Sequence, residues 1–324
     1  MSALARARLA ERLPLALVLL ALVGLVTLAL FGTRPFAEAA DLDADAHSLP
    51  LASQPCGRSS ETPAHYRHVI WIWMENHSYD QVIGGDGSPF ETALSRACGL
   101  ATNYHSIRHP SLPNYLAATG GSTFGFTRDR PPAAQPIDAP SIFSEVAASG
   151  RQWRTYVEAM PANCQAMGKY GFARNPAAYF TQSRSQCPAW DLPLGRSRSG
   201  AFATALRTDR LPAFSLVIPD KCHSTHGCPV TSGDAWLSHW VNRIVASRSY
   251  RNGSTAVFLT WDEGKRDLNQ HIALIVVSPT TPRGAVSRAR LNHYSLLRAT
   301  AGLLGIRPPG RAGTARGLDR PFGL

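Results

Sequence analysis

The chain has 324 residues, and its hydrophobic content of 44% is enough for a sizeable core in one large α/β domain. The formal net charge of +11 would suit phosphorylated or otherwise anionic partners, but 30 of the 33 basic residues are arginine, and a general composition bias explains the charge better. No basic stretch is interleaved with aromatic residues as a nucleic-acid groove would be, so we expect no nucleic-acid binding.

The first 40 residues have the features of an export segment. Three arginines precede an almost purely apolar stretch, Leu13–Phe31, and Ala37-Glu38-Ala39 is a plausible cleavage site. The apolar stretch is long for a signal peptide and just long enough to span a bilayer. Residues 1–40 are therefore predicted to be a signal peptide or a membrane anchor. The body would lie outside the cell, secreted or held on the extracellular face of the membrane.

Residues 41–64 are predicted to be a linker, and residues 65–324 the globular domain. Strands and helices are expected to alternate along that domain, and this order favours a mainly parallel central sheet with helices on both faces. The strands are expected at 68–74, 100–105, 153–157, 213–218, 256–261 and 271–278. The helices are expected at 89–97, 112–119, 141–149, 199–208, 234–247 and 293–304, with Gly233-Asp234 as an N-cap signal. Residues 160–198 break the alternation, which we interpret as an irregular insertion and a candidate lid on the substrate side.

Six cysteines, an even number, fit an exported protein with disulfides. The alternative, a thiolate metal site, has little support because the spacing matches no zinc motif. The candidate pairs are Cys222–Cys228 closing a small loop, Cys164–Cys187 across the insertion, and Cys56–Cys98 tying down the N-terminal arm.

Polar residues follow two of the predicted strands at once. Glu75–Ser78 comes directly after the strand at 68–74, and Asp262 and Glu263 come directly after the strand at 256–261. Ligands of open α/β sheets bind at the carboxyl ends of the strands. Carboxylate and imidazole groups gathered there are typical of a divalent-metal hydrolase. These two strand ends are therefore predicted to share one metal-bearing site.

Other residues could complete such a site. Ser111 lies at the start of a predicted helix in the segment His-Pro-Ser-Leu-Pro-Asn, where backbone N–H groups can receive a phosphate and a metal could turn its hydroxyl into a nucleophile. The alternative is that Ser111 only caps the helix. Further candidates are His109 as a phosphate contact, Asp220, His223 and His226 after the strand at 213–218, His271, and His293 at the start of the last helix.

The segments MENHSYDQVIG, HPSLPNYLAATGG, GDAWL, TWDEG and NHYSLLRATAGLLG resemble the bacterial phosphoesterase family. That family holds acid phosphatases and phospholipase C-type enzymes and belongs to the alkaline phosphatase superfamily. The resemblance implies an alkaline phosphatase-like fold and a divalent metal. The positions that match the family's functional residues are Ser111 as nucleophile, Glu75 and Asn76 as the first metal-ligand position, Asp262 and Glu263 as paired acidic ligands, and His293 as the late histidine.

The chain departs from the family pattern in one segment. Ile-Pro-Asp-Lys-Cys-His-Ser-Thr-His has His223-Ser224 where relatives usually have Asn-Asp. A ligand role there would fall to Asp220, His223 or His226, or a second metal would be absent. We therefore expect one metal site rather than two, and the identity of its metal stays open.

These observations predict an exported, metal-dependent phosphomonoesterase of the acid phosphatase type. Ser111 would form a phosphoserine intermediate, with Asn76 and His109 stabilising the charge on the phosphoryl group. The substrate would be a phosphorylated small molecule or a lipid headgroup, and the N-terminal segment could hold the enzyme at a membrane. The alternatives are a phosphodiesterase or phospholipase C-type hydrolase, and a non-catalytic surface-binding domain.

Overall fold

The computed structural model describes residues 48–165, 168–265 and 270–324. The predicted export segment, 1–40, lies outside these residues. No helix within the described residues is long and apolar enough to cross a membrane.

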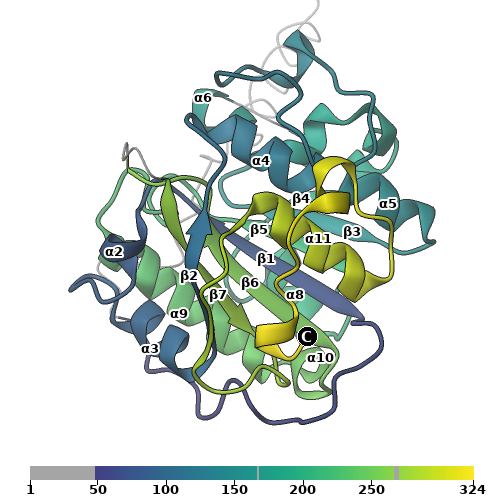
Figure 1. The fold of residues 1–324 in the computed structure, drawn as a ribbon. Helices are drawn as coiled ribbons and strands as arrows, with labels where there is room; N and C mark the ends of the chain where they lie inside the picture. Colours follow the sequence, from purple (N-terminus) through teal and green to yellow (C-terminus); the bar gives the residue numbers. More distant parts are fainter. Residues whose placement is uncertain (1–47, 166–167, 266–269) are drawn as a thin grey trace, which may run out of the picture. The chain divides into compact units, whose positions relative to one another are not determined.

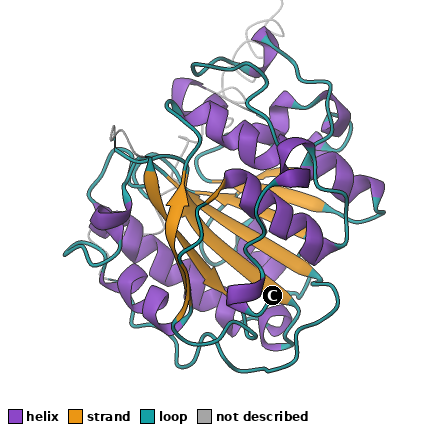
Figure 2. Ribbon diagram, in the orientation of Figure 1, coloured by secondary structure: helices purple, strands orange, loops and turns teal. Residues whose placement is uncertain are grey.

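A nine-stranded sheet forms the centre of the domain, and helices cover both of its sides (Figures 1 and 2). The strand order is β4-β3-β5-β1-β6-β7-β2-β8, with β9 paired to β2. Every pairing of the described strands is parallel except the two made by β7, which runs antiparallel to β6 and β2. The prediction of a mainly parallel sheet with helices on both faces is confirmed.

The strands are short and almost wholly buried at the centre of the sheet. They are β1 (His68–Met74), β2 (Gly99–His105), β3 (Trp153–Val157), β4 (Asp191–Pro193), β5 (Phe214–Ile218), β6 (Thr255–Trp261), β7 (His271–Val277), β8 (Ala285–Ser287) and β9 (Leu291–Asn292). All seven residues of β6 are buried. A strand covered on both faces reads as a continuous apolar run, which is why the sequence located the central strands.

The α-helices of the described residues are α2 (Tyr79–Val82), α3 (Pro89–Ala97), α4 (Ser111–Gly120), α5 (Ile142–Ala148), α6 (Gly168–Ala173), α7 (Cys187–Trp190), α8 (Ala201–Arg207), α9 (Val230–Ala246), α10 (Arg248–Arg251) and α11 (His293–Leu304). Helix α4 packs on α11, and α3 packs on α9. The indole N–H of Trp71 in β1 donates to Thr300 in α11 at 2.9 Å, which fixes that helix on the sheet.

One predicted helix start is wrong. Helix α9 begins at Val230, four residues before the predicted cap, Asp234. The carboxylate of Asp234 instead accepts hydrogen bonds from the backbone N–H groups of Phe90 and Glu91, at 3.2 and 2.9 Å. Asp234 thus caps helix α3, which is 143 residues away in the sequence, and local sequence cannot reveal such a long-range cap.

Three disulfides, Cys56–Cys98, Cys164–Cys187 and Cys222–Cys228, confirm the predicted pairs. Within the predicted linker, the backbone N–H groups of Leu49 and Ala52 donate to Ser238 and Asn242 of α9.

The insertion at 160–198 is more ordered than its composition suggests. Its described residues include the short α-helices α6 and α7 and two 3-10 helices, Pro176–Tyr179 and Thr181–Ser183, and the chain returns to the sheet as the edge strand β4, which pairs with β3.

Candidate active site

The candidate site lies where β1 and β6 end side by side. Met74 pairs with Trp261, so Glu75 and Asp262 are the next residues on adjacent parallel strands. Asn76 turns the chain sharply with φ of 55°, a left-handed conformation that asparagine tolerates better than most residues. Its backbone N–H donates to Oδ1 of Asp262 at 3.1 Å and locks the two strand ends together.

Ser111 faces these strand ends from the first turn of helix α4. Its hydroxyl lies 3.4 Å from Oε2 of Glu75 and 3.5 Å from Oε1 of Glu263. Both carboxylates are buried, and Ser111 itself is only 5% exposed. The structure therefore brings together the predicted nucleophile and the carboxylates from both predicted strand ends.

Burial and mutual repulsion raise the pKa values of two of these clustered carboxyl groups. Burial, with the nearby charges of Glu75 and Glu263, raises the pKa of Asp262 well above its usual range. Burial and the charges of Glu75 and Asp129 raise the pKa of Glu263 to about 9. These carboxyl groups lie too close together to stay ionised without a further positive charge.

Glu75 differs because it has a cationic partner, Arg174, which the sequence analysis missed. Burial alone would raise the pKa of Glu75, but the Arg174 guanidinium, with hydrogen bonds from His226 and Tyr115, holds it below its usual value. Arg174 donates to Oε2 of Glu75, and the hydroxyl of Tyr115 donates to Oε1 at 2.5 Å.

Different sequence signals were available for these two residues. Tyr115 follows Ser111 by four residues, so helical spacing could have placed both on one face of α4. Arg174 sits among other arginines of the insertion and follows no strand, so no local signal pointed to it.

The loop before Ser111 is tied to the site by His109 and Asn114. Nδ1 of His109 lies 2.9 Å from Oε2 of Glu263, and the side-chain amide of Asn114 donates to the same oxygen at 3.3 Å. The N–H of Leu112 at the start of α4 donates to Asp129 at 3.0 Å. This helix end is thus already partly neutralised by a carboxylate of the protein.

The remaining predicted ligands take other positions. His226 borders the site, with Nδ1 3.2 Å from Arg174 and 3.6 Å from Oε2 of Glu75. The side chain of His293 contacts the Asp262 backbone carbonyl at 2.8 Å through Nε2 and the Tyr104 hydroxyl at 2.9 Å through Nδ1. Both of its ring nitrogens are therefore used in holding the strand end.

Asp220 and His223 belong to a neighbouring cluster with Glu158. Nδ1 of His223 lies 2.9 Å from Glu158, while Oδ1 of Asp220 accepts the backbone N–H groups of Cys222 and His223, both at 2.8 Å. His271 stacks on Tyr79 with ring centroids 4.5 Å apart.

The sequence model of the Phosphoesterase family matches residues 85–306, more than half of the chain. The chain belongs to the phosphoesterase family. The match includes Ser111, Asp262 and Glu263, and it confirms the resemblance drawn from the motifs.

Characterised proteins with detectable sequence similarity to this chain are named as phosphatases. A phosphatidylinositol-3-phosphatase of Mycobacterium tuberculosis is 28% identical over 254 residues, which cover 77% of this chain and 81% of that protein. An acid phosphatase of Aspergillus fumigatus is 23% identical over 76% of this chain, but the match spans only 56% of the fungal protein. Together with the family match, they confirm the prediction of a phosphoric ester hydrolase.

The fold is shared more widely than the sequence. A crystal structure of a protein in the alkaline phosphatase superfamily from Vibrio parahaemolyticus aligns with a TM-score of 0.55 at 12% identity, covering 86% of this chain and 78% of that one. The predicted alkaline phosphatase-like fold is confirmed, and this likeness concerns the fold alone.

The donor set of this phosphoesterase suits a hard divalent cation. Oδ2 of Asp262 is buried and makes no hydrogen bond within the distance limits among the described residues, and the charges of Glu75 and Glu263 act on this carboxyl group. Mg²⁺, Ca²⁺ and Mn²⁺ prefer such oxygen ligands.

Two tighter groups of potential ligands occur elsewhere in the described residues, each with its ligand atoms within 4.8 Å of one another. The group containing Cys164 and Cys187 is ruled out as a thiolate site, because these sulfurs form a disulfide. In the group of Glu158, Asp220 and His223, hydrogen bonds within the protein already join the three side chains or hold them to the backbone. The buried carboxyl groups that need a further positive charge to ionise are instead Asp262 and Glu263.

Proposed function

We propose that this chain is a metal-dependent phosphomonoesterase that uses Ser111 as its nucleophile. The observation that carries the proposal is the position of the Ser111 hydroxyl, which lies between Glu75 and Glu263 at 3.4 and 3.5 Å at the buried ends of β1 and β6. A serine that served only as a helix cap would not need two carboxylates beside its oxygen.

Glu75, Asp262 and Glu263 would hold the metal, with Asn76 beside them. When bound, such a cation supplies positive charge that lowers the pKa of a neighbouring hydroxyl and stabilises the charge on phosphoryl oxygens. His293 orients the Asp262 backbone in this proposal, because both of its ring nitrogens are already occupied.

Each side chain of the site has a different role in the proposed reaction. Ser111 loses its proton to an adjacent carboxylate and attacks phosphorus in line. The bond from phosphorus to the ester oxygen breaks, the departing oxygen takes up a proton to give the alcohol, and a phosphoserine is left. Arg174, whose guanidinium lies over Glu75, can donate to the equatorial phosphoryl oxygens as charge develops on them. His109 holds Glu263 and, with Asn76, borders the same space. Water then attacks the phosphoserine and restores Ser111.

The acid phosphatase and phosphatidylinositol-3-phosphatase names of the relatives support a monoester, carried on a small molecule or a lipid headgroup. We further propose export to the cell exterior. Three disulfides support it, because structural disulfides form in oxidising compartments.

The test compares hydrolysis of p-nitrophenyl phosphate and bis-p-nitrophenyl phosphate by residues 41–324, with chelator and after metal is restored. The proposal predicts metal-dependent turnover that favours the monoester. A preference for the diester would favour the phosphodiesterase alternative, and no turnover of either ester under any metal would favour a binding domain.

A further inference from the structure

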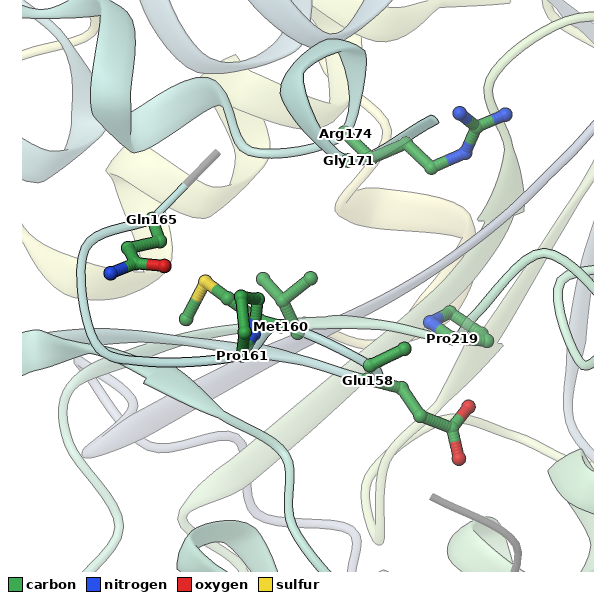
Figure 3. A pocket seen from close by; sticks show the side chains of 9 residues that line it. Glu158, Met160, Pro161, Gln165, Gly171, Arg174 and Pro219 are labelled. Atoms are coloured by element: carbon green, nitrogen blue, oxygen red, sulfur yellow. The ribbon is translucent and has the colours of Figure 1, made fainter. Parts of the chain in front are cut away.

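A pocket of about 220 Å³ opens beside Arg174 and has no role in the proposed chemistry so far. One wall is the chain that leaves β3, including Met160 and Pro161, and another is helix α6 with Gly171 (Figure 3). Pro219, just after β5, closes a third side. The lining is therefore mostly apolar and comes from three separate segments.

Glu158 is the acidic residue of the pocket lining, and its carboxylate is held by hydrogen bonds to other residues. The Glu158 carboxylate accepts hydrogen bonds from Trp236 at 3.3 Å and from His223 at 2.9 Å, and Figure 3 shows it directed away from Met160. The pocket thus offers no free carboxylate to a ligand.

The walls are held by contacts that involve buried groups. The side-chain amide of Asn175 lies 3.6 Å from the sulfur of Met160 and 2.7 Å from Oδ2 of Asp191. Asn175 and Asp191 are both almost fully buried. The Cys164–Cys187 disulfide closes the segment that carries helix α6 and Arg174. The wall formed by Met160 is therefore held by buried groups of the insertion.

Arg174 joins this pocket to the catalytic centre. It lines the pocket, and its guanidinium donates to Oε2 of Glu75, the same oxygen that the Ser111 hydroxyl approaches at 3.4 Å. An organic group on the Arg174 side of a phosphoryl group at Ser111 would therefore face the pocket.

We propose that this pocket binds the organic group of the phosphoester and selects a flat apolar group such as an aromatic ring. The inference rests on the proposed phosphomonoesterase function. A ring buried against Met160 and the prolines gains from leaving water. A small polyol without an apolar part, such as that of glycerol 2-phosphate, would gain less from these walls, where Gln165 and Arg174 are the polar side chains besides Glu158.

The test fills the pocket from two opposite walls and compares an aromatic with a small substrate. Gly171→Phe places a ring on α6 at a position where an added Cβ meets no atom within 4 Å, and Met160→Trp enlarges the other wall. Gly302→Phe is the matched control, because it is also a helical glycine with open space at its Cβ and it lines a different pocket. Melting temperatures establish that each variant folds.

The quantity measured is the ratio of kcat/KM for phenyl phosphate to kcat/KM for methyl phosphate. We expect both filling variants to lower this ratio by about tenfold or more, mainly through KM, since a single methylene in an apolar site can already change specificity by that factor. The Gly302→Phe control should keep the wild-type ratio. The wild-type enzyme should also prefer phenyl phosphate to glycerol 2-phosphate.

The outcomes separate this inference from the function on which it rests. An active wild-type enzyme whose filled variants keep the phenyl-to-methyl ratio would overturn the pocket's role and leave the phosphatase intact. A preference of the wild type for glycerol 2-phosphate would likewise overturn the apolar assignment. A wild-type protein that hydrolyses none of the three esters would overturn both.

Discussion

Replacing Cys164 and Cys187 by alanine should lower activity at temperatures where the protein is still folded. Their disulfide, with a sequence separation of 23 residues, closes the segment that carries Arg174 and one wall of the pocket. Arg174 is the cation that holds Glu75 ionised, so a loosened segment would disturb both the carboxylate cluster and the phosphoryl contact.

The magnitude follows from the length of the closed loop. The chain-entropy relation gives about 3.5 kcal/mol of stability for this disulfide. The same relation gives about 4 kcal/mol for Cys56–Cys98, whose separation is 42 residues. The second disulfide therefore makes a suitable control, because its removal costs as much stability. Cys98 directly precedes β2, which runs in the same direction as β6, so this disulfide lies at the end of the sheet away from the carboxyl end of β6.

Urea unfolding followed by tryptophan fluorescence measures the stability of both double variants, and kcat/KM on phenyl phosphate measures their activity at 25 °C. We expect the Cys164/Cys187 variant to lose about tenfold in kcat/KM, equal to about 1.4 kcal/mol of transition-state stabilisation. The Cys56/Cys98 variant should stay close to the wild type while it is folded. Equal activities in the two variants would refute the claim that this disulfide positions Arg174.

Three further predictions concern single residues. Ser111→Ala should lower kcat by several orders of magnitude while the metal content stays near normal, and a large residual activity would point to direct attack by water. Asp262→Asn should lower bound metal and activity together, with partial rescue by added metal, and elemental analysis showing full occupancy would remove Asp262 from the ligand set. Burial raises the pKa of Asp191 from 3.8 to about 6. Between these values the folded protein binds more protons than the unfolded chain, so stability should fall as pH rises, by about 3 kcal/mol in total from this group. Urea unfolding should show that the free energy of unfolding falls less between pH 4 and pH 7 in Asp191→Asn than in the wild type. Identical falls in the two proteins would contradict the assignment of this pH dependence to Asp191.

The sequence was a good guide where burial made the pattern unambiguous. The central strands β1 and β6 are buried on both faces, so they appeared as apolar runs, and the abrupt change to Glu75 and Asp262 marked the carboxyl edge of the sheet. Parallel pairing then placed both residues together without any further information.

The parts that sequence reasoning missed depend on tertiary contacts. Asp234 had the local features of a cap for its own helix, yet it caps α3. Arg174 reaches Glu75 from an insertion whose path is set by a disulfide and by the edge strand β4. The late histidine, His293, lies next to Asp262 as the motif suggested. Its hydrogen bonds to Tyr104 and to the Asp262 carbonyl are the basis of the positioning role that we propose for it, and residue type alone could not have indicated these bonds.

The central claim is that Ser111 is the phosphoryl acceptor, and the most direct measurement is to trap the intermediate. The metal-loaded enzyme is mixed with excess phenyl phosphate, quenched in acid within its first turnovers, digested and analysed by mass spectrometry. The account predicts a phosphorylated peptide with the modification on Ser111, and its loss in Ser111→Ala. Steady turnover without phosphate on Ser111 at any quench time, together with an active Ser111→Ala variant, would contradict it.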